Sequence, residues 1–549
     1  MSEAAGGITP WEYHQRTRHH LDRYAAGPGT LDWDAQPDPF RRYDGCSEIP
    51  LPLTPTSTAV AFGDLHRPGA IAPAPLELAW LGRLLELSLG LSAWKQYGPD
   101  RWALRCNPSS GNLHPTEGYL VSRGLPDLAD GVYHYRPDAH LLEQRAAVAS
   151  APPDGRPVAL LGLTSIHWRE AWKYGERAYR YCQLDVGHAL AALAYAAALL
   201  GWRLRPLAHW PDAAVAALLG VDRPADGTEP EHPDLLLAVD TGPTGDAAEP
   251  DAWLAWMREA PWRGRPNVLD RRRLYQWPVL DAVSRAAAKP ATPILSPAVH
   301  DAPAVRPAAG DDRPAMAVIR ERRSAQAYDP AGTMPLAVLE ALLERLVPRA
   351  GVPPWSALPE TDRVHPLLFV HRVDDLAQGL YALPRSAAGR ALLLGALDAR
   401  FAWDACPELN LGGATLYRLA SGDMRRTAGL LCCHQAIAAQ GAVTFMLLGE
   451  WDAALDAEPW RYRWRHWEAG ALGQALYLNA EAAGLRGTGI GCYFDPAVHE
   501  VLGLSDRRLQ SFYHFTIGRP LLDARIQSLP PYAHLQGDRD HRLGFSSSG

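Results

Sequence analysis

The sequence has few cysteines and no C-x-x-C pair among them. Its seven cysteines are scattered over 549 residues, at positions 46, 106, 182, 406, 432, 433 and 492. A disulfide framework or a structural zinc site needs sulfur atoms in regular, closely spaced sets, and an odd, scattered count gives neither. We therefore expect no bound metal and no structural disulfide framework.

The chain also lacks a basic excess, a long apolar run and an N-terminal signal. Its net charge is −7, whereas nucleic-acid-binding surfaces gather positive charge into patches. No run approaches the roughly 18 uncharged apolar residues of a membrane span, and the opening MSEAAGGITPWEYHQRTRHH contains no apolar h-region. These absences exclude nucleic acid and a membrane as partners and predict a cytoplasmic protein.

The composition and length fit a folded protein with two cores. Hydrophobic residues make up 47% and charged residues 21% of the chain, and single cores stop growing at roughly 250–300 residues. A Pro/Ala-rich stretch over 286–314, which includes KPATPILSPAVHDAPAVRPAAGDDRP, has no regular period and predicts a linker. We expect an N-terminal extension over 1–60, domains over 61–285 and 315–535, and a tail over 536–549.

The two halves of the chain repeat one another, which predicts a duplication. The segment LPDLADGVY, residues 125–133, reappears as VDDLAQGLY, residues 373–381, and the preceding helices begin alike at Pro75 and Pro335. A third set of matches keeps identical spacing, with Arg180, Asp185, Gly187 and Gly201 against Arg463, Glu468, Gly470 and Gly484. Residues 189–200 are apolar on every side of a helix, so each half is predicted to be an α+β domain around a buried central helix.

Three short segments carry groups that suit a phosphate and a flat ring. Arg322-Arg323-Ser324 offers paired guanidiniums beside a hydroxyl, although a solvated basic turn is the simpler interpretation of such a motif alone. Residues 105–117, RCNPSSGNLHPTE, form a compact hydrogen-bonding loop or, alternatively, a helix-capping turn. Residues 484–491, GLRGTGIG, allow close backbone approach to a ligand or form a helix C-cap.

Together these segments resemble the nitroreductase-like flavoproteins. E-R-R-S-x-x-x-Y-D-P is similar to that family's opening motif, P-S-S-G-N-x-H-P to its ring-contacting loop, and G-L-x-G-T-G-I-G with F-x-x-F-T-I-G-R-P to its C-terminal end. The resemblance implies tandem FMN-dependent domains, with FMN contacts at Arg322, Arg323, Ser324, Gln326, Pro108, Ser109, Ser110, Asn112, Thr488, Gly489, Ile490 and Gly491. Gln326 stands where the family often has a second basic residue, and we expect Arg519 or Arg525 to supply the missing charge.

The first half resembles, more narrowly, the SagB/ThcOx-type dehydrogenases, which are azoline oxidases of ribosomal-peptide natural-product pathways. Y-H-Q-x-T-R-H-H from Tyr13 and L-D-W-D-x-Q-P-D-P-F-R-R-Y from Leu31 are typical of it, as are Lys173 and Tyr174. That family ties the Lys-Tyr pair to azole formation; without the family context, a surface turn is the simpler interpretation. The resemblance implies dehydrogenation of a thiazoline or oxazoline in a peptide-derived or amino-acid-derived substrate, with a cyclodehydratase or other biosynthetic enzyme as partner.

Each half lacks a motif that the other retains. Before Pro75 the first half has AFGDLHRPGAIAPA where an R-R-S is needed, and the second half has AGVPPWSALPETDRVHP where the serine-asparagine loop belongs. Two subunits share each flavin in the family, so the sequence predicts an intrachain pseudo-dimer with one complete FMN site. Further oligomerisation stays open.

Removing a proton and a hydride from an azoline requires a base as well as a hydride acceptor. Lys173 is the predicted base and Tyr174 its helper; Arg177 and Arg180 are expected to lower the lysine pKa. Two alternatives remain. One is a flavin oxidase or an NAD(P)H-dependent nitroreductase-type enzyme acting on another small molecule; the other is a flavin-free scaffold subunit of a modification complex.

Overall fold

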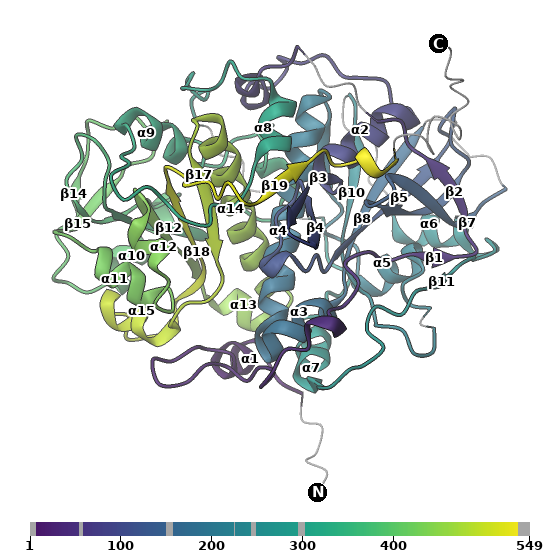
Figure 1. The fold of residues 1–549 in the computed structure, drawn as a ribbon, viewed down its shortest axis with the longest axis horizontal. Coiled ribbons are helices and arrows are strands. Elements are labelled where there is room, and N and C mark those ends of the chain that lie inside the picture. Colours follow the sequence, from purple (N-terminus) through teal and green to yellow (C-terminus); the bar gives the residue numbers. More distant parts are fainter. Residues whose placement is uncertain are drawn as a thin grey trace, which may run out of the picture.

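The computed structural model describes residues 7–53, 59–149, 157–223, 225–242, 249–294 and 302–535. The predicted tail, 536–549, and part of the predicted linker, 295–301, lie outside the described residues. The remaining chain folds into two α+β halves that lie side by side (Figure 1).

The first half is built on a seven-stranded antiparallel sheet with the strand order β2-β7-β6-β5-β8-β10-β9. Its strands are β2 (Ser47–Pro50), β5 (Thr116–Arg123), β6 (Gly131–Arg136), β7 (Leu141–Ala147), β8 (Val158–Ser165), β9 (Arg203–Pro206) and β10 (His232–Asp240). Its central strands β5 and β8 are almost wholly buried because helices cover the sheet.

The second half repeats this topology with the order β14-β15-β13-β12-β16-β18-β17. Its strands are β12 (Val364–Val370), β13 (Gly379–Ala382), β14 (Asp404–Ala405), β15 (Tyr417–Ser421), β16 (Val443–Glu450), β17 (Arg486–Ile490) and β18 (Leu509–Gly518). The two sheets correspond position by position, with β5 matching β12, β8 matching β16 and β9 matching β17. The predicted tandem of two α+β domains is confirmed.

Helices surround both sheets. They are α1 (Pro10–Arg16), α2 (Leu78–Ser88), α3 (His167–Tyr174), α4 (Ala178–Leu199), α5 (Asp212–Leu219), α6 (Pro250–Met257), α7 (Pro278–Ala286), α8 (Ala315–Glu321), α9 (Leu336–Glu344), α10 (Ala387–Ala396), α11 (Arg425–Leu431), α12 (Ala436–Gln440), α13 (Ala453–Ala457), α14 (Arg461–Ala482) and α15 (Asp495–Leu502). Short 3₁₀ helices are η1 (Trp33–Ala35), η2 (Phe62–His66), η3 (Ser110–Asn112), η4 (Gly175–Arg177), η5 (Trp355–Ala357) and η6 (Ala533–Leu535).

The long helices α4 and α14 pack against one another at the centre of the molecule (Figure 1). Both have 22 residues and are buried on nearly every side. A Cβ atom on Gly187 would lie 2.3 Å from the carbonyl oxygen of Trp467, and one on Gly470 would lie 2.2 Å from that of Leu184. The two glycines therefore let the backbones touch, and their reciprocal contacts join the halves around one shared core.

The segment His167–Leu199, which spans α3 to α4, has the length and apolarity of a membrane span, and 94% of its most apolar window is buried inside the protein. Its apolar character is accounted for by its place in the core, because a helix buried on all sides needs no polar face.

The chain crosses back at its C-terminal end. β19 (Gln527–Leu529) pairs with β3 (Leu91–Tyr97), which forms a hairpin with β4 (Asp100–Arg105) in the first half. Figure 1 shows this yellow segment running from the second half across to the first. A further pair of short strands, β1 (Tyr43–Asp44) and β11 (Arg265–Pro266), lies in the first half. The crossing segment closes one wall of the cavity between the halves.

Candidate functional site

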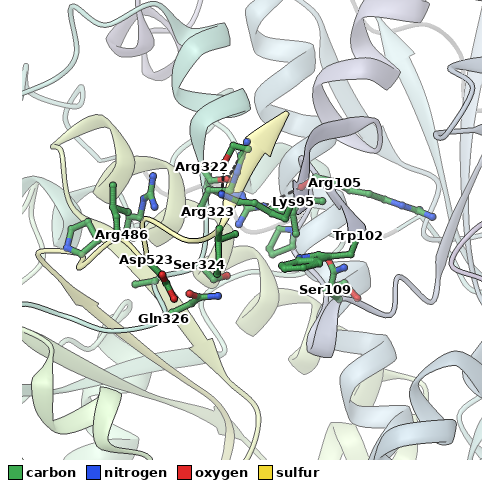
Figure 2. A pocket seen from close by; sticks show the side chains of 18 of the residues that line it. Lys95, Trp102, Arg105, Ser109, Arg322, Arg323, Ser324, Gln326, Arg486 and Asp523 are labelled. Atoms are coloured by element: carbon green, nitrogen blue, oxygen red, sulfur yellow. Dashed lines mark hydrogen bonds between the residues drawn. The ribbon is translucent and has the colours of Figure 1, made fainter. Parts of the chain in front are cut away.

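A cavity of about 520 Å³ lies between the two halves and takes residues from both (Figure 2). The β3–β4 hairpin and the loop after it form one side, and the segment after α8 with β17 forms the other. The principal lining side chains are Lys95, Trp102, Asn107, Pro108, Ser109, Asn112, Arg322, Arg323, Ser324, Gln326 and Arg486. All three segments singled out in the sequence thus meet across the interface between the halves, the third of them through Arg486.

Five Lys and Arg residues line this cavity, but the guanidinium of Arg105 donates to the carbonyl oxygens of Thr116 and Pro39. The other four cations are Lys95, Arg322, Arg323 and Arg486. Arg322 is 4% exposed and donates to the carbonyl oxygen of Arg105 at 3.0 Å. Arg323 donates at 2.6 Å to the carbonyl oxygens of Arg320 and Arg322, and burial, reinforced by the neighbouring Arg322, lowers its pKa to about 10. Arg486 lies 3.6 Å from a Glu481 carboxylate oxygen, and Lys95 donates to Ser528.

Carbonyl and hydroxyl oxygens, which carry no full negative charge, are the near partners of three of these four cations. Their positive charges lie close together in a partly dehydrated cleft: burial lowers the pKa of Lys95, Arg322 and Arg323, and the charge of Arg486 lowers all three further. Such a cluster is electrostatically unbalanced unless an anion enters it, and guanidinium groups suit a phosphate in particular. The arrangement is chemically suited to a phosphate group.

The loop after β4 is held in an unusual backbone conformation by its own hydrogen bonds. Gly111, Asn112 and His114 all have positive φ values, between 53° and 61°. The Asn112 amide donates to the carbonyl oxygen of Ala103 at 2.9 Å, and the backbone N–H of His114 donates to Ser109 Oγ at 2.8 Å. These bonds fix the loop so that Pro108, Ser109 and Asn112 face the cavity.

The segments around Ser324 and β17 are connected through one tyrosine. The hydroxyls of Ser324 and Tyr477 lie 2.8 Å apart, and the backbone N–H of Gly489 donates to the Tyr477 hydroxyl at 2.9 Å. Thr488 Oγ1 donates to the carbonyl oxygen of Ala325 at 2.6 Å. A Cβ atom on Gly489 would lie 1.7 Å from the Tyr513 hydroxyl, so only glycine lets the strand pass this close.

A second cavity of about 250 Å³ adjoins the first and shares Pro108, Ser109 and Ser324 with it. It is also lined by Ser110, Gly111, Tyr174, Tyr181, Asp185, His188, Gln435, Tyr477, Gly489, Ile490, Gly491, Cys492 and Tyr513. The predicted loop residue Ser110 and the predicted glycine-rich exit therefore line this second space. Thr488, whose hydroxyl donates to the Ala325 carbonyl oxygen, is not among the lining residues of either cavity.

Lys173 and Tyr174 both reach the tip of the loop after β4. A Cβ atom on Gly111 would lie 2.7 Å from the Tyr174 hydroxyl and 3.2 Å from Lys173 Nζ. Tyr174 lines the second cavity, and burial raises the pKa of its hydroxyl well above the ordinary value. The hydroxyl therefore remains protonated and can donate a hydrogen bond to a molecule in this space.

The expected role of Arg177 and Arg180 beside Lys173 is wrong. Both side chains turn toward the start of α15, where Arg177 lies 3.1 Å and Arg180 2.8 Å from the oxygens of Asp495. Both are at least 98% buried, and the ion pairs hold the pKa of Asp495 below its ordinary value. The two arginines join the halves through this carboxylate, because a buried charge is tolerated only when it is paired.

Two carboxyl groups, those of Asp185 and Glu170, lie near the loop tip where the sequence predicted Arg177 and Arg180. Neither was predicted as a site residue. Asp185 lines the second cavity and accepts hydrogen bonds from the backbone N–H and the hydroxyl of Ser110, both at 3.1 Å. Burial raises the pKa of Asp185 to about 7. Glu170 on α3 is fully buried, and burial together with the neighbouring Asp185 raises its pKa well above the ordinary range.

One feature of the sequence could have indicated Asp185 as a site residue, and little in the sequence could have indicated Glu170. Asp185 is the repeat counterpart of Glu468, which in the second half is paired with Arg385 instead. Glu170 precedes Lys173 by one helical turn in α3, a spacing that places the two side chains on one face of the helix. Its burial beside Asp185 follows from the packing of α3 on α4 and could not be predicted locally.

The structure does not bring the charge expected from Arg519 or Arg525 to the large cavity. Neither arginine is among the lining residues of the large cavity, although Gln326 is. Arg525 is exposed and pairs with Asp523 at 2.7 Å. Lys95 and Arg486, which were not predicted, occupy the cavity wall instead.

The internal repeat gives the large cavity an equivalent position on the other side of the molecule, and the residues that line that position differ from those of the cavity. A space of about 360 Å³ there is lined by the segment before α2, the chain leaving α4 and the loop containing Gly351. Arg203 is the repeat counterpart of Arg486, since each lies two residues after a matched glycine, Gly201 or Gly484. Arg67, which also lines this space, is paired with Asp64. The R-R-S motif and the serine-asparagine loop have no counterparts among these lining residues.

These features agree with the comparisons to known proteins. The sequence pattern of the nitroreductase family matches residues 74–239 and 319–519, one match in each half. The chain belongs to the nitroreductase family, and it carries two copies of that family's domain.

The chain is similar to several individual proteins. A nitroreductase-like protein of Methanocaldococcus jannaschii is 25% identical over 177 residues, which cover 30% of this chain and 81% of that protein. A nitroreductase-like structure from Anabaena variabilis has a TM-score of 0.67 at 23% identity and covers 93% of this chain and 99% of its own, so it shares the whole two-domain fold. A chain of the E. coli microcin synthetase McbBCD complex, solved with truncated pro-MccB17 bound, has a TM-score of 0.28 at 16% identity and covers 37% of this chain and 70% of its own.

Proposed function

We propose that the chain is an FMN-dependent dehydrogenase that oxidises a thiazoline or oxazoline ring, in a peptide-derived or amino-acid-derived substrate, to the azole. The observation that carries this proposal is the cluster of four cations in the large cavity next to a second cavity that Tyr174 lines. Family membership supports an oxidoreductase. The azoline substrate implies an upstream cyclodehydratase as a partner enzyme.

The residues present fit FMN. Arg322, Arg323 and Arg486 with Lys95 would hold the phosphate, since their charges have few anionic partners within the protein. The loop after β4 and the glycines of β17 would hold the ring system, because Gly489 brings the backbone close to the shared wall of the two cavities. FMN, when bound, supplies the acceptor for the hydride that leaves the substrate.

The protein itself supplies positioning and proton transfer. Tyr174 lines the second cavity; Lys173 is not among its lining residues, but its Nζ lies beside the Tyr174 hydroxyl at the loop tip, Gly111, which does line it. Lys173 Nζ takes the substrate proton, and the protonated Tyr174 hydroxyl donates a hydrogen bond that orients the ring. Tyrosine rings shape this space, and the ring centroid of Tyr181 lies 4.5 Å from that of Tyr174 with the two rings tilted by 52°.

The experiment compares Lys173→Ala and Tyr174→Phe with the unchanged chain, scoring both bound flavin and azole formation. General-base catalysis contributes about 10²–10⁴-fold, so Lys173→Ala should lose activity by that order while it keeps the flavin. Tyr174→Phe keeps the ring and should show a smaller loss. Full activity in both variants would overturn the mechanism, and loss of flavin in Lys173→Ala would identify that lysine as structural.

The family match keeps an NAD(P)H-dependent reductase as the second candidate. Rapid mixing of the flavin-loaded protein with NADPH distinguishes the two activities. Fast, complete bleaching of flavin absorbance at physiological NADPH concentrations would favour the reductase, whereas a spectrum that stays oxidised until an azoline substrate is added would favour the dehydrogenase.

A further inference from the structure

Two cysteines from distant parts of the second half lie together: Cys492 lines the second cavity, and Cys433 lies against it from behind that wall. Cys433 is in the turn between α11 and α12, and Cys492 is the second residue after β17. Two hydrogen bonds tie these segments together: the backbone N–H of Phe494 donates to the carbonyl oxygen of Leu431 at 2.9 Å, and the Gln435 amide donates to that of Cys492 at 3.3 Å. Both cysteines are half-buried, so small molecules can reach them.

Their thiols contact each other and are not equivalent. The hydrogen bond from Cys433 lowers the pKa of Cys492, helped by the charge of Arg177, while the same contact and burial raise the pKa of Cys433. Cys492 is thus the more readily ionised sulfur, and Cys433 is the adjacent thiol. Reactive cysteines have this environment, in which a cation lies nearby and the side chain is partly exposed.

The neighbouring Cys432 provides a contrast within the same turn. It is fully buried, its Sγ lies 3.3 Å from Nδ1 of His514, and burial raises its pKa. Cys432 is therefore a core residue. Of the two adjacent cysteines, only Cys433 contacts the cavity residue Cys492.

We propose that Cys433 and Cys492 form a redox pair, in which a hydroperoxide entering the second cavity converts the two thiols into a reversible disulfide. The Cys492 thiolate attacks one peroxide oxygen; the S–O bond forms, the O–O bond breaks, and the departing oxygen leaves as water or alcohol after taking a proton. Cys433 then attacks the oxidised sulfur of Cys492, which forms the S–S bond and releases the oxygen as water. Two thiols lose two electrons to the peroxide, and a dithiol reductant restores them.

The pair lies where a new bond would change the active cavity. Gly491 and Cys492 line that cavity, and Arg177 donates to the Gly491 carbonyl oxygen at 3.2 Å. A disulfide would fix the chain after β17 to the turn between α11 and α12. The proposal rests on the thiol contact and the cavity, and it stands independently of the flavin chemistry proposed above.

The experiment counts free thiols in the reduced full-length protein before and after treatment with a small excess of hydrogen peroxide. The protein is unfolded in N-ethylmaleimide and weighed intact by mass spectrometry. Seven adducts are expected before treatment, since the chain has seven cysteines, and two fewer afterwards, with all seven recovered by dithiothreitol. Cys492→Ser should lose no thiol pair, and Cys433→Ser should leave a sulfenic acid at Cys492 that dimedone traps.

Cys46→Ser is the matched control, because Cys46 is also half-buried but lies in the first half outside both cavities. It should still lose two thiols. Peptide mapping of the oxidised wild-type protein decides the result even if a variant fails to fold, and it should join the peptides that contain Cys433 and Cys492. Seven adducts after peroxide, or a bond between any other two cysteines, would overturn the proposal.

Discussion

At the scale of single residues, the cavity cations carry the most direct test of cofactor binding. We predict that Arg322→Ala or Arg323→Ala weakens FMN binding by roughly tenfold or more, because a charge-assisted phosphate contact contributes about 1.5–3 kcal/mol. Equilibrium titration of the apoprotein with FMN, followed by flavin fluorescence, measures the dissociation constants. Arg525→Ala is the control, since Arg525 is exposed and pairs with Asp523; equal FMN affinity in all three variants would place the phosphate elsewhere.

Asp185 gives the protein a pH dependence whose sign can be stated. Its pKa is raised from 3.8 to about 7 by burial, so the folded chain binds this proton more tightly than the unfolded chain does. Between pH 3.8 and about 7, stability therefore falls as pH rises. Asp185→Asn keeps an oxygen that accepts the Ser110 hydrogen bond but removes the titration, and we predict that it stabilises the protein more at pH 7 than at pH 5.

Melting temperatures of wild type and variant at both pH values check this prediction. Asp100→Asn, at an exposed position of β4, is the control and should show no such difference between pH values. A melting-temperature difference between Asp185→Asn and wild type that is the same at pH 5 and pH 7 would contradict the raised pKa.

Residues that belong to a contiguous motif could be found in the sequence, and residues brought in by tertiary packing could not. Arg322, Arg323 and Ser324 are adjacent in the chain and all face the cavity. Lys95 arrives on the β3–β4 hairpin of the other half, and its neighbours carry no motif. Arg177 and Arg180 show the converse error, because nearness to Lys173 in sequence did not predict which face of the helix they occupy.

At the scale of elements, the crossing of α4 and α14 sets how closely the halves pack. We predict that Gly187→Ala lowers the stability of the whole protein by about 1–3 kcal/mol, the usual cost of forcing extra volume into a packed core. The added methyl would lie 2.3 Å from the Trp467 carbonyl oxygen, an atom of the helix backbone that cannot rotate away. Chemical denaturation monitored by tryptophan fluorescence measures the change.

Gly395→Ala is the matched control for this substitution. Gly395 is an exposed residue of α10, and a Cβ atom there would come no nearer than 3.9 Å to Arg508. Alanine is the better helix former, so this variant should be neutral or slightly more stable. Equal changes in the free energy of unfolding at both positions would show that the close α4–α14 contact does not determine the stability of the protein.

The elements themselves were predictable to different degrees. The apolar run at 189–200 predicted a buried central helix, and the structure extends it to Ala178–Leu199 because polar residues in its first half are also buried, against the partner half. The return of the C-terminal segment as β19 was not predicted. Three residues pairing with an edge strand of the other half leave no periodic pattern in the sequence.

At the scale of the whole molecule, the two duplicated halves contribute different segments to the cavities, whereas two identical subunits would each contribute the same ones. The first half supplies the loop after β4 and the Lys173-Tyr174 pair, while the second half supplies the R-R-S segment and β17. Because each half retains only its own segments, all four of these segments come together at one interface between the halves. The equivalent place on the opposite side keeps Arg203 but has neither the paired arginines nor the serine-asparagine loop.

This asymmetry predicts one FMN per chain. Denaturing the flavin-saturated protein and quantifying released FMN against protein should give a ratio near one, because the 520 Å³ cavity gathers four cations, three of which have carbonyl or hydroxyl oxygens as their near partners, whereas Arg67 in the 360 Å³ space is held by Asp64. The combined Arg322→Ala and Arg323→Ala variant adds a sharper criterion. With one site, this variant should lose nearly all bound flavin, whereas with two independent sites it would retain about half. A ratio near two in the wild type, together with half retention in the variant, would contradict the prediction. It would mean that the second site also binds FMN, despite the different sequences of the two halves.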